Sequence, residues 1–198
     1  MTPFISALLT LAAAMIALLA LRRVFGFSAQ RPIDYSAQSP RFDLRSNLSG
    51  PIECEGVIYG PTGRVTSRFV AKMHGTWDGN RGVLREHFSY ASGTEQMREW
   101  RLTISADGRV IAEADDVVGT GTGEVSGPTV YLNYDIKLPA SAGGHVLAVQ
   151  DWMYLTQNGT IINRSQFRKF GFKVAELVAT LRPAAAAAAA APMLEAAE

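Results

Sequence analysis

The sequence predicts an all-β protein, an antiparallel up-and-down barrel of about 8–10 strands with one N-terminal transmembrane helix. Three observations predict it. Apolar and polar residues alternate from Val130 to Leu138, a period of two that puts the apolar side chains on one face of a strand. Similar short runs recur along the chain and are separated by turn residues. An apolar stretch precedes all of them.

The first element is the apolar run from Phe4 to Leu21, in which only Ser6 and Thr10 are polar. At about 1.5 Å per residue, such a helix approaches the thickness of the hydrocarbon layer. No Lys or Arg precedes the run, and Arg22 follows it directly, which favours a retained anchor over a cleaved signal peptide. Residues 1–25 are therefore predicted to be a transmembrane anchor.

Five arginines follow this apolar run: Arg22, Arg23, Arg31, Arg41 and Arg45. The positive-inside rule places such a segment in the cytoplasm, although the same side chains also suit contact with anionic headgroups on either face. Residues 26–41 contain Gly26, Pro32 and Pro40 among polar residues, which predicts a juxtamembrane linker running over the membrane surface.

The strands come next. They are predicted at 52–59, 64–77, 83–90, 96–105, 109–114, 117–125, 130–138, 145–156, 161–170 and 172–181. Turn residues at 60–63, 78–80, 106–108 and 157–160 favour hairpins between neighbours. A meander hides its edges best by closing, so residues 42–182 are predicted to form a barrel domain, with an open curved sheet or a sandwich as the alternative. Residues 183–198 are an alanine-rich tail.

Several phrases in the barrel region resemble one bacterial envelope family, the domain of unknown function 3833. They are residues 60–65 with Arg68-Phe69, residues 75–79, residues 151–155, residues 162–164 and residues 169–172. The resemblance implies a lipocalin-like fold and, for many members, lipoproteins exported to the periplasm. This chain departs from that pattern because it lacks the lipid-attachment cysteine. Its expected location is the bacterial inner membrane, single-pass, with charge favouring a cytoplasmic domain and the resemblance a periplasmic one.

Composition argues against several functions. The chain has 19 basic and 18 acidic residues, scattered rather than clustered, so a nucleic-acid partner is not expected. Cys54 has no partner cysteine, and two histidines on one hairpin, His74 and His87, are too few for a metal site. Neither a metal nor a cofactor is expected, and no nucleophile motif indicates an enzyme.

Polar residues that interrupt apolar runs, including Glu86, Arg98 and Asp151, suggest either a structural polar network or a binding site inside the barrel. Large aromatic residues suit either a filled core or the wall of a cavity. The predicted ligand-binding residues are Glu86, Tyr90, Trp100, Tyr134, Asp151, Trp152, Tyr154, Asn163 and Arg164.

Three functions follow from this pattern. The first is a membrane-anchored module that binds a lipid or other hydrophobic small molecule at the bilayer surface. The alternative is a non-catalytic accessory or assembly subunit of an integral membrane protein complex, which predicts a cavity-free core. The third is an enzyme acting on a lipophilic substrate, which requires a carboxylate of raised pKa facing a cavity.

Overall fold

The computed structural model describes residues 3–184 of the chain. The predicted alanine-rich tail lies, from residue 185 onward, outside the described residues. Within the described part, ten strands follow an N-terminal helix, α1 (Pro3–Val24), and a short helix, α2 (Leu44–Asn47). Three short 3-10 helices accompany them: η1 (Phe27–Ala29), η2 (Pro32–Tyr35) and η3 (Ala140–Ala142).

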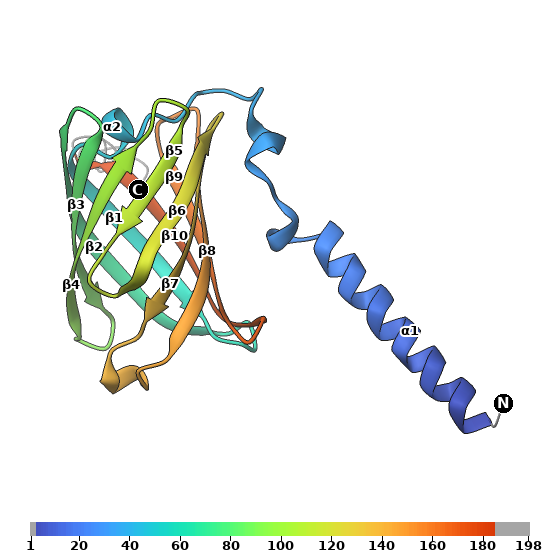
Figure 1. Cartoon of the computed structure of the whole chain (residues 1–198). Coiled ribbons are helices and arrows are strands. Elements are labelled where there is room, and N and C mark those ends of the chain that lie inside the picture. The colour runs from blue at the N-terminus through green and yellow to red at the C-terminus, as the bar shows by residue number, and fades with distance from the viewer. Residues whose placement is uncertain (1–2, 185–198) are drawn as a thin grey trace, which may run out of the picture.

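The strands form one closed antiparallel barrel (Figure 1). Their bounds are β1 Gly50–Tyr59, β2 Val65–Asp78, β3 Arg81–Tyr90, β4 Glu95–Ile104, β5 Arg109–Glu113, β6 Val117–Ser126, β7 Thr129–Lys137, β8 Val146–Leu155, β9 Ile161–Lys169 and β10 Phe172–Pro183. Each strand pairs with its neighbours in the chain, and β1 pairs with β10 to close the ring. The predicted up-and-down barrel is confirmed, and each predicted strand overlaps an observed one.

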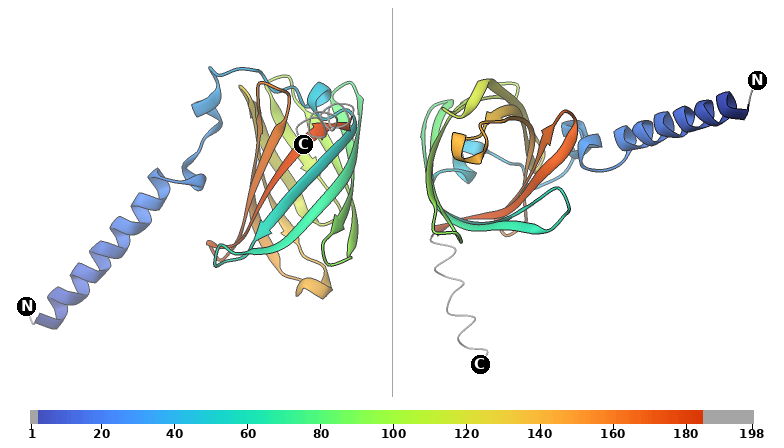
Figure 2. Two further views of the ribbon diagram at one scale, coloured as in Figure 1. Left: turned by 180° about the vertical axis from the view of Figure 1, so that it is seen from behind. Right: turned by 90° about the horizontal axis from the view of Figure 1, so that it is seen from below.

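Alternation along the strands builds the core. Within β7, Val130, Leu132 and Tyr134 are buried and point inward, whereas Asn133 and Asp135 between them are exposed. The other strands contribute in the same way, so one continuous apolar cluster fills much of the barrel. Consecutive turns lie at opposite ends of the barrel, as an up-and-down meander requires (Figure 2).

Helix α1 extends away from the barrel (Figure 1), and large apolar side chains along it, among them Phe4, Leu11 and Ile16, are exposed. Among the described residues, no helix combines the length and the apolar character that crossing a bilayer requires. A helix is observed within residues 1–25, as predicted, but its assignment as a transmembrane span is not supported. The apolar run from Phe4 to Leu21 is close to the lower limit of length for a span, about 17 residues.

Residues 27–43 are here called the covering segment; Gln30 and Tyr35 lie against the outer face of the barrel, and Phe42 belongs to the core cluster. Trp152 points outward from β8 and is only 1% exposed, because the ring of Tyr35 packs edge-on against it at 5.5 Å. Gln30 Oε1 accepts a hydrogen bond from the Tyr154 hydroxyl at 2.7 Å. These residues include most of the stretch predicted as a linker, and their aromatic members fix them to the barrel.

Helix α2 continues from the covering segment into one end of the barrel (Figure 2). Asp43 caps it, because its carboxylate accepts a hydrogen bond from the backbone N–H of Arg45. Leu44 and Leu48 are each 2% exposed and belong to the core cluster. The Trp77 indole donates a hydrogen bond to the backbone carbonyl of Leu48 at 2.9 Å, which ties α2 to β2.

Candidate functional site

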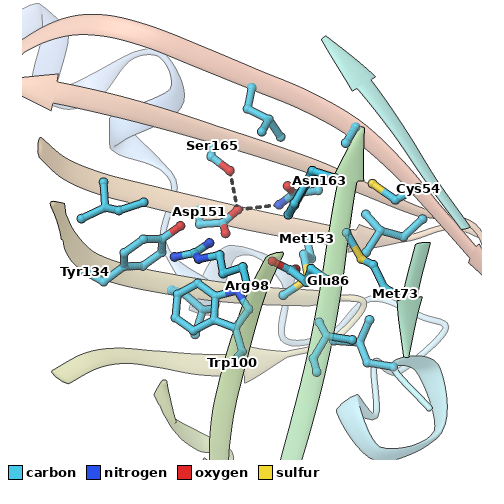
Figure 3. Close-up of a pocket in the computed structure, with 18 of the residues that line it drawn as sticks. Cys54, Met73, Glu86, Arg98, Trp100, Tyr134, Asp151, Met153, Asn163 and Ser165 are labelled. Carbon is cyan, nitrogen blue, oxygen red and sulfur yellow. Dashed lines mark hydrogen bonds between the residues drawn. The ribbon is translucent and has the colours of Figure 1, made fainter. Parts of the chain in front are cut away.

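A cavity of about 120 Å³ lies inside the barrel, beneath α2. Its wall is mainly apolar, with Leu48 directly after α2, Phe69 and Met73 of β2, and Leu177 of β10 among its members. A smaller polar set interrupts this wall: Glu86, Arg98, Tyr134, Asp151, Asn163 and Ser165 (Figure 3). A mostly apolar cavity with a few converging polar groups is the usual form of a small-molecule site.

Glu86 and Arg98 form the centre of this polar set. They are directly opposite each other on β3 and β4, and both point into the barrel. Glu86 Oε2 and Arg98 Nη2 are buried and have no hydrogen-bond partner within the described part of the chain. Burial raises the pKa of the Glu86 carboxyl to about 7, although the nearby guanidinium of Arg98 opposes that rise.

Arg98 is positioned by its neighbours. Its Nε donates a hydrogen bond to the carboxylate of Asp116 at 3.1 Å, and this ion pair is largely buried. The guanidinium lies over the Trp100 ring, 4.1 Å from its centroid, and Tyr134 packs edge-on against the same indole. These contacts hold the guanidinium at the wall with Nη2 unpaired (Figure 3).

Asp151 of β8 lies on another part of the wall. Its Oδ1 accepts hydrogen bonds from the Asn163 amide and, at 2.8 Å, from the Ser165 hydroxyl, both on β9. Burial nevertheless raises the pKa of Asp151, because these two hydrogen bonds only partly offset the loss of water. Asp151 therefore belongs to a satisfied structural network beside Glu86 Oε2 and Arg98 Nη2, the two atoms without a partner.

The structure divides the nine predicted site residues into three groups. Those that line the cavity are Glu86, Trp100, Tyr134, Asp151 and Asn163. Tyr90 points inward but lies apart from the cavity wall, where it stacks with Phe88 and donates a hydrogen bond to Gln96. Whether any of these residues binds a ligand stays a prediction.

The remaining three point out of the barrel. Trp152 and Tyr154 hold the covering segment, as described above, and Arg164 forms an ion pair with Glu176 while its guanidinium lies 4.8 Å from the Phe27 ring centroid. The reason is strand parity, because Asp151 and Trp152 are adjacent and must face opposite sides. These residues therefore cannot line the same cavity as Asp151.

The sequence analysis named Arg98 among the polar residues inside the barrel but not among the predicted ligand-binding residues, and it did not name Ser165. The period of two along a strand could have found both, because Arg98 precedes Trp100 by two residues and Ser165 follows Asn163 by two.

Cys54 also lines the cavity, and burial raises the pKa of its thiol to about 12, so the thiol is neutral near pH 7. Among the described residues, no three His, Cys, Asp or Glu side chains are grouped to hold a metal ion.

Two solved structures share the fold. The crystal structure of Rv2717c from M. tuberculosis has a TM-score of 0.52 and 16% identity, and the match covers 74% of this chain and 98% of that one. A protein with unknown function from the DUF3598 family of Nostoc punctiforme has a TM-score of 0.50 and 13% identity, with 73% of this chain covering 50% of that one. At these identities, both show a common fold alone.

No curated protein matches the chain in sequence. One family does match, and it does so over residues 21–183, which include the covering segment, α2 and the whole barrel. The sequence resemblance in the barrel region is thereby confirmed, and the chain belongs to the DUF3833 family, described as protein of unknown function.

Proposed function

We propose that the barrel binds one small, mainly apolar molecule that carries a single hydroxyl or carboxyl group. The apolar wall of the cavity supports the first part of this proposal. A dry cavity of about 150 Å³ in another protein accommodates benzene, so a cavity of about 120 Å³ suits a small ring or a short chain. This is lipocalin-like binding on a small scale.

The observation that carries the proposal is that Glu86 Oε2 and Arg98 Nη2 are both buried without a hydrogen-bond partner among the described residues. Leaving a buried polar atom without a partner costs about 1–3 kcal/mol, so a ligand group that hydrogen-bonds to both atoms gains that free energy on binding. A hydroxyl group satisfies both atoms, because it donates to the carboxylate and accepts from the guanidinium. A ligand carboxylate does the same when Glu86 is protonated, since it then accepts from both side chains.

Native mass spectrometry of the full-length protein, purified gently in mild detergent and followed by extraction, tests this proposal. We expect a stoichiometric small organic molecule. Ala179 lines the cavity, so Ala179→Leu should fill it and remove the adduct, whereas Ala148→Leu on the exposed outer face of β8 should retain it. Circular dichroism confirms that both variants fold. An adduct-free wild-type protein, with only water in the site, would contradict the proposal.

One observation favours a second candidate, an enzyme acting on a lipophilic substrate. Glu86 is a carboxyl group whose pKa is raised to about 7 and that faces an apolar cavity, which is the requirement for a general acid near neutral pH. Arg98 would then stabilise negative charge on the substrate. The test is to incubate the protein with the molecule identified by mass spectrometry and to measure its conversion, which Glu86→Gln should abolish. A molecule that stays unchanged after prolonged incubation would exclude this activity for that compound.

The accessory-subunit alternative has weaker support. It predicts a cavity-free core, whereas the barrel contains a cavity of about 120 Å³. Protein subunits that co-purify without any small molecule would favour this alternative over the binding proposal.

A further inference from the structure

The β9–β10 hairpin ends in an unusual two-residue turn. Phe170 and Gly171 both adopt the left-handed region, with φ of 52° and 81°, between the paired residues Lys169 and Phe172. Such turns favour Asn or Asp followed by Gly, because a bulky side chain at positive φ is strained. Among the non-glycine residues that the structure describes, Phe170 alone has a positive φ. The fold would be more stable with another residue there.

The Phe170 side chain is hardly buried, so packing does not compensate for the strain of its backbone. Phe170 is 89% exposed and Phe172 is 71% exposed. The turn between β9 and β10 lies at the lower right of the barrel in Figure 1. Phe25, 67% exposed, lines a shallow groove together with Phe172. Three exposed phenylalanines at one corner form an apolar patch, and strained residues of this kind concentrate at functional sites.

Basic side chains surround this patch. Lys169 Nζ lies 5.7 Å from the centroid of the Phe170 ring, and Arg168 and Lys173 belong to the same hairpin. Glu176 is the acidic residue nearby, and it is already paired with Arg164 and Lys173. Lys169 and Arg168 therefore leave the patch with a positive charge.

We propose that the Phe170–Phe172 tip inserts into the headgroup region of an anionic phospholipid bilayer. Exposed aromatic side chains beside lysine and arginine suit that region, where rings enter the apolar boundary and cations contact anionic headgroups. The exposed apolar side chains of α1 directly precede Phe25 in the chain. This surface is independent of the central cavity, so either proposal can fail without the other.

The decisive experiment measures lipid contact at the tip itself. Full-length Phe170→Trp protein is mixed with phosphatidylcholine–phosphatidylglycerol vesicles containing brominated lipid. Of the three native tryptophans, Trp100 and Trp152 are buried, 6% and 1% exposed, and Trp77 is half-buried near the β2–β3 turn, so quenching in excess of that of the wild-type protein reports on residue 170. We expect quenching and a blue shift for Phe170→Trp. Asn158→Trp, on the exposed turn at the opposite end of the barrel, is the matched control and should remain unquenched.

A second variant separates binding from folding. Phe170→Asn relieves the strain at positive φ, so we expect a higher midpoint of thermal unfolding. It also removes the apolar contact with the bilayer, so we expect severalfold faster amide exchange at residues 168–174 when vesicles are present. Phe170→Leu keeps the apolar contact and should retain protection without the gain in stability. Unquenched Phe170→Trp, equal quenching at both ends, or shielding of residue 170 by a co-purified protein without vesicles would overturn the proposal.

Discussion

At the scale of single residues, Glu86 has the environment that most affects stability. Its carboxyl group is 7% exposed, has an unpaired oxygen, and has a pKa raised from 4.5 to about 7 by burial. Such a shift means that the folded protein favours the protonated form. The stability of the protein should therefore depend on pH, with Glu86 as one contributor.

Below about pH 4.5, Glu86 is protonated in both states, and its contribution is fully present. As the pH rises toward 7, the unfolded chain releases the proton first, so the free energy of unfolding falls. We expect a loss of about 3 kcal/mol across this interval, which Glu86→Gln should remove because glutamine does not titrate. Urea unfolding at four pH values measures the difference between the two proteins.

The control for this prediction is Glu53→Gln, which changes an exposed carboxylate on the outer face of β1. Its pH profile should follow that of the wild type. A Glu86→Gln profile parallel to the wild type would show that Glu86 ionises normally in the folded protein and would also weaken its role as a general acid.

At the scale of elements, the alternation of residues predicted the strands well and the site incompletely. Each strand has an apolar face with a period of two, a local signal that the turns reinforce, and closure follows from hiding the edges. The same period separates Asp151 from Trp152, and applying it would have removed Trp152, Tyr154 and Arg164 from the cavity wall. The packing of Tyr35 on the barrel had no such local signal, because its partners lie more than a hundred residues away.

The covering segment provides a prediction at this scale. Trp152→Ala removes a ring that contacts Tyr35, Tyr131 and Tyr154, and should lower the free energy of unfolding by about 3–5 kcal/mol. Amide exchange at residues 27–38 should accelerate. Tyr154→Phe, which loses one hydrogen bond to Gln30, should cost about 1 kcal/mol. Equal effects of the two variants would show that the segment does not depend on the indole.

Helix α2 depends on Gly75 in a different way. A Cβ atom at Gly75 would lie 1.9 Å from the Leu48 carbonyl oxygen, so the close approach of α2 to β2 requires glycine. Gly75→Ala should displace α2, destabilise the protein by about 1–3 kcal/mol, and accelerate exchange at residues 44–48. Thr76→Ala, on the exposed outer face next to it, should leave α2 in place. Hydrogen exchange distinguishes displacement of α2 from general destabilisation.

At the scale of the whole molecule, one seam closes the barrel. Residues of β1 from Ile52 to Tyr59 pair with residues of β10 from Pro183 to Glu176, at the two ends of the sheet in sequence. Contacts between segments so far apart in the chain form slowly, because a long loop must be ordered before they stabilise anything. Closure of the seam is therefore expected to follow the main barrier to folding.

Gly56 tests this expectation. Its Cβ position would lie 2.8 Å from both the Ala179 methyl group and the Val178 carbonyl oxygen across the seam, and 2.6 Å from the Phe69 ring. Gly56→Ala should lower the free energy of unfolding by about 1–3 kcal/mol. If the seam closes late, the unfolding rate rises while the refolding rate is unchanged.

Glu55→Ala is the control. It loses only partly exposed contacts with Thr180 and Arg182 and should change the free energy of unfolding by about 1 kcal/mol or less. Stopped-flow unfolding and refolding in urea measures both rates. Slower refolding of Gly56→Ala would mean that β1 and β10 already pair in the folding transition state, and would contradict late closure of the seam.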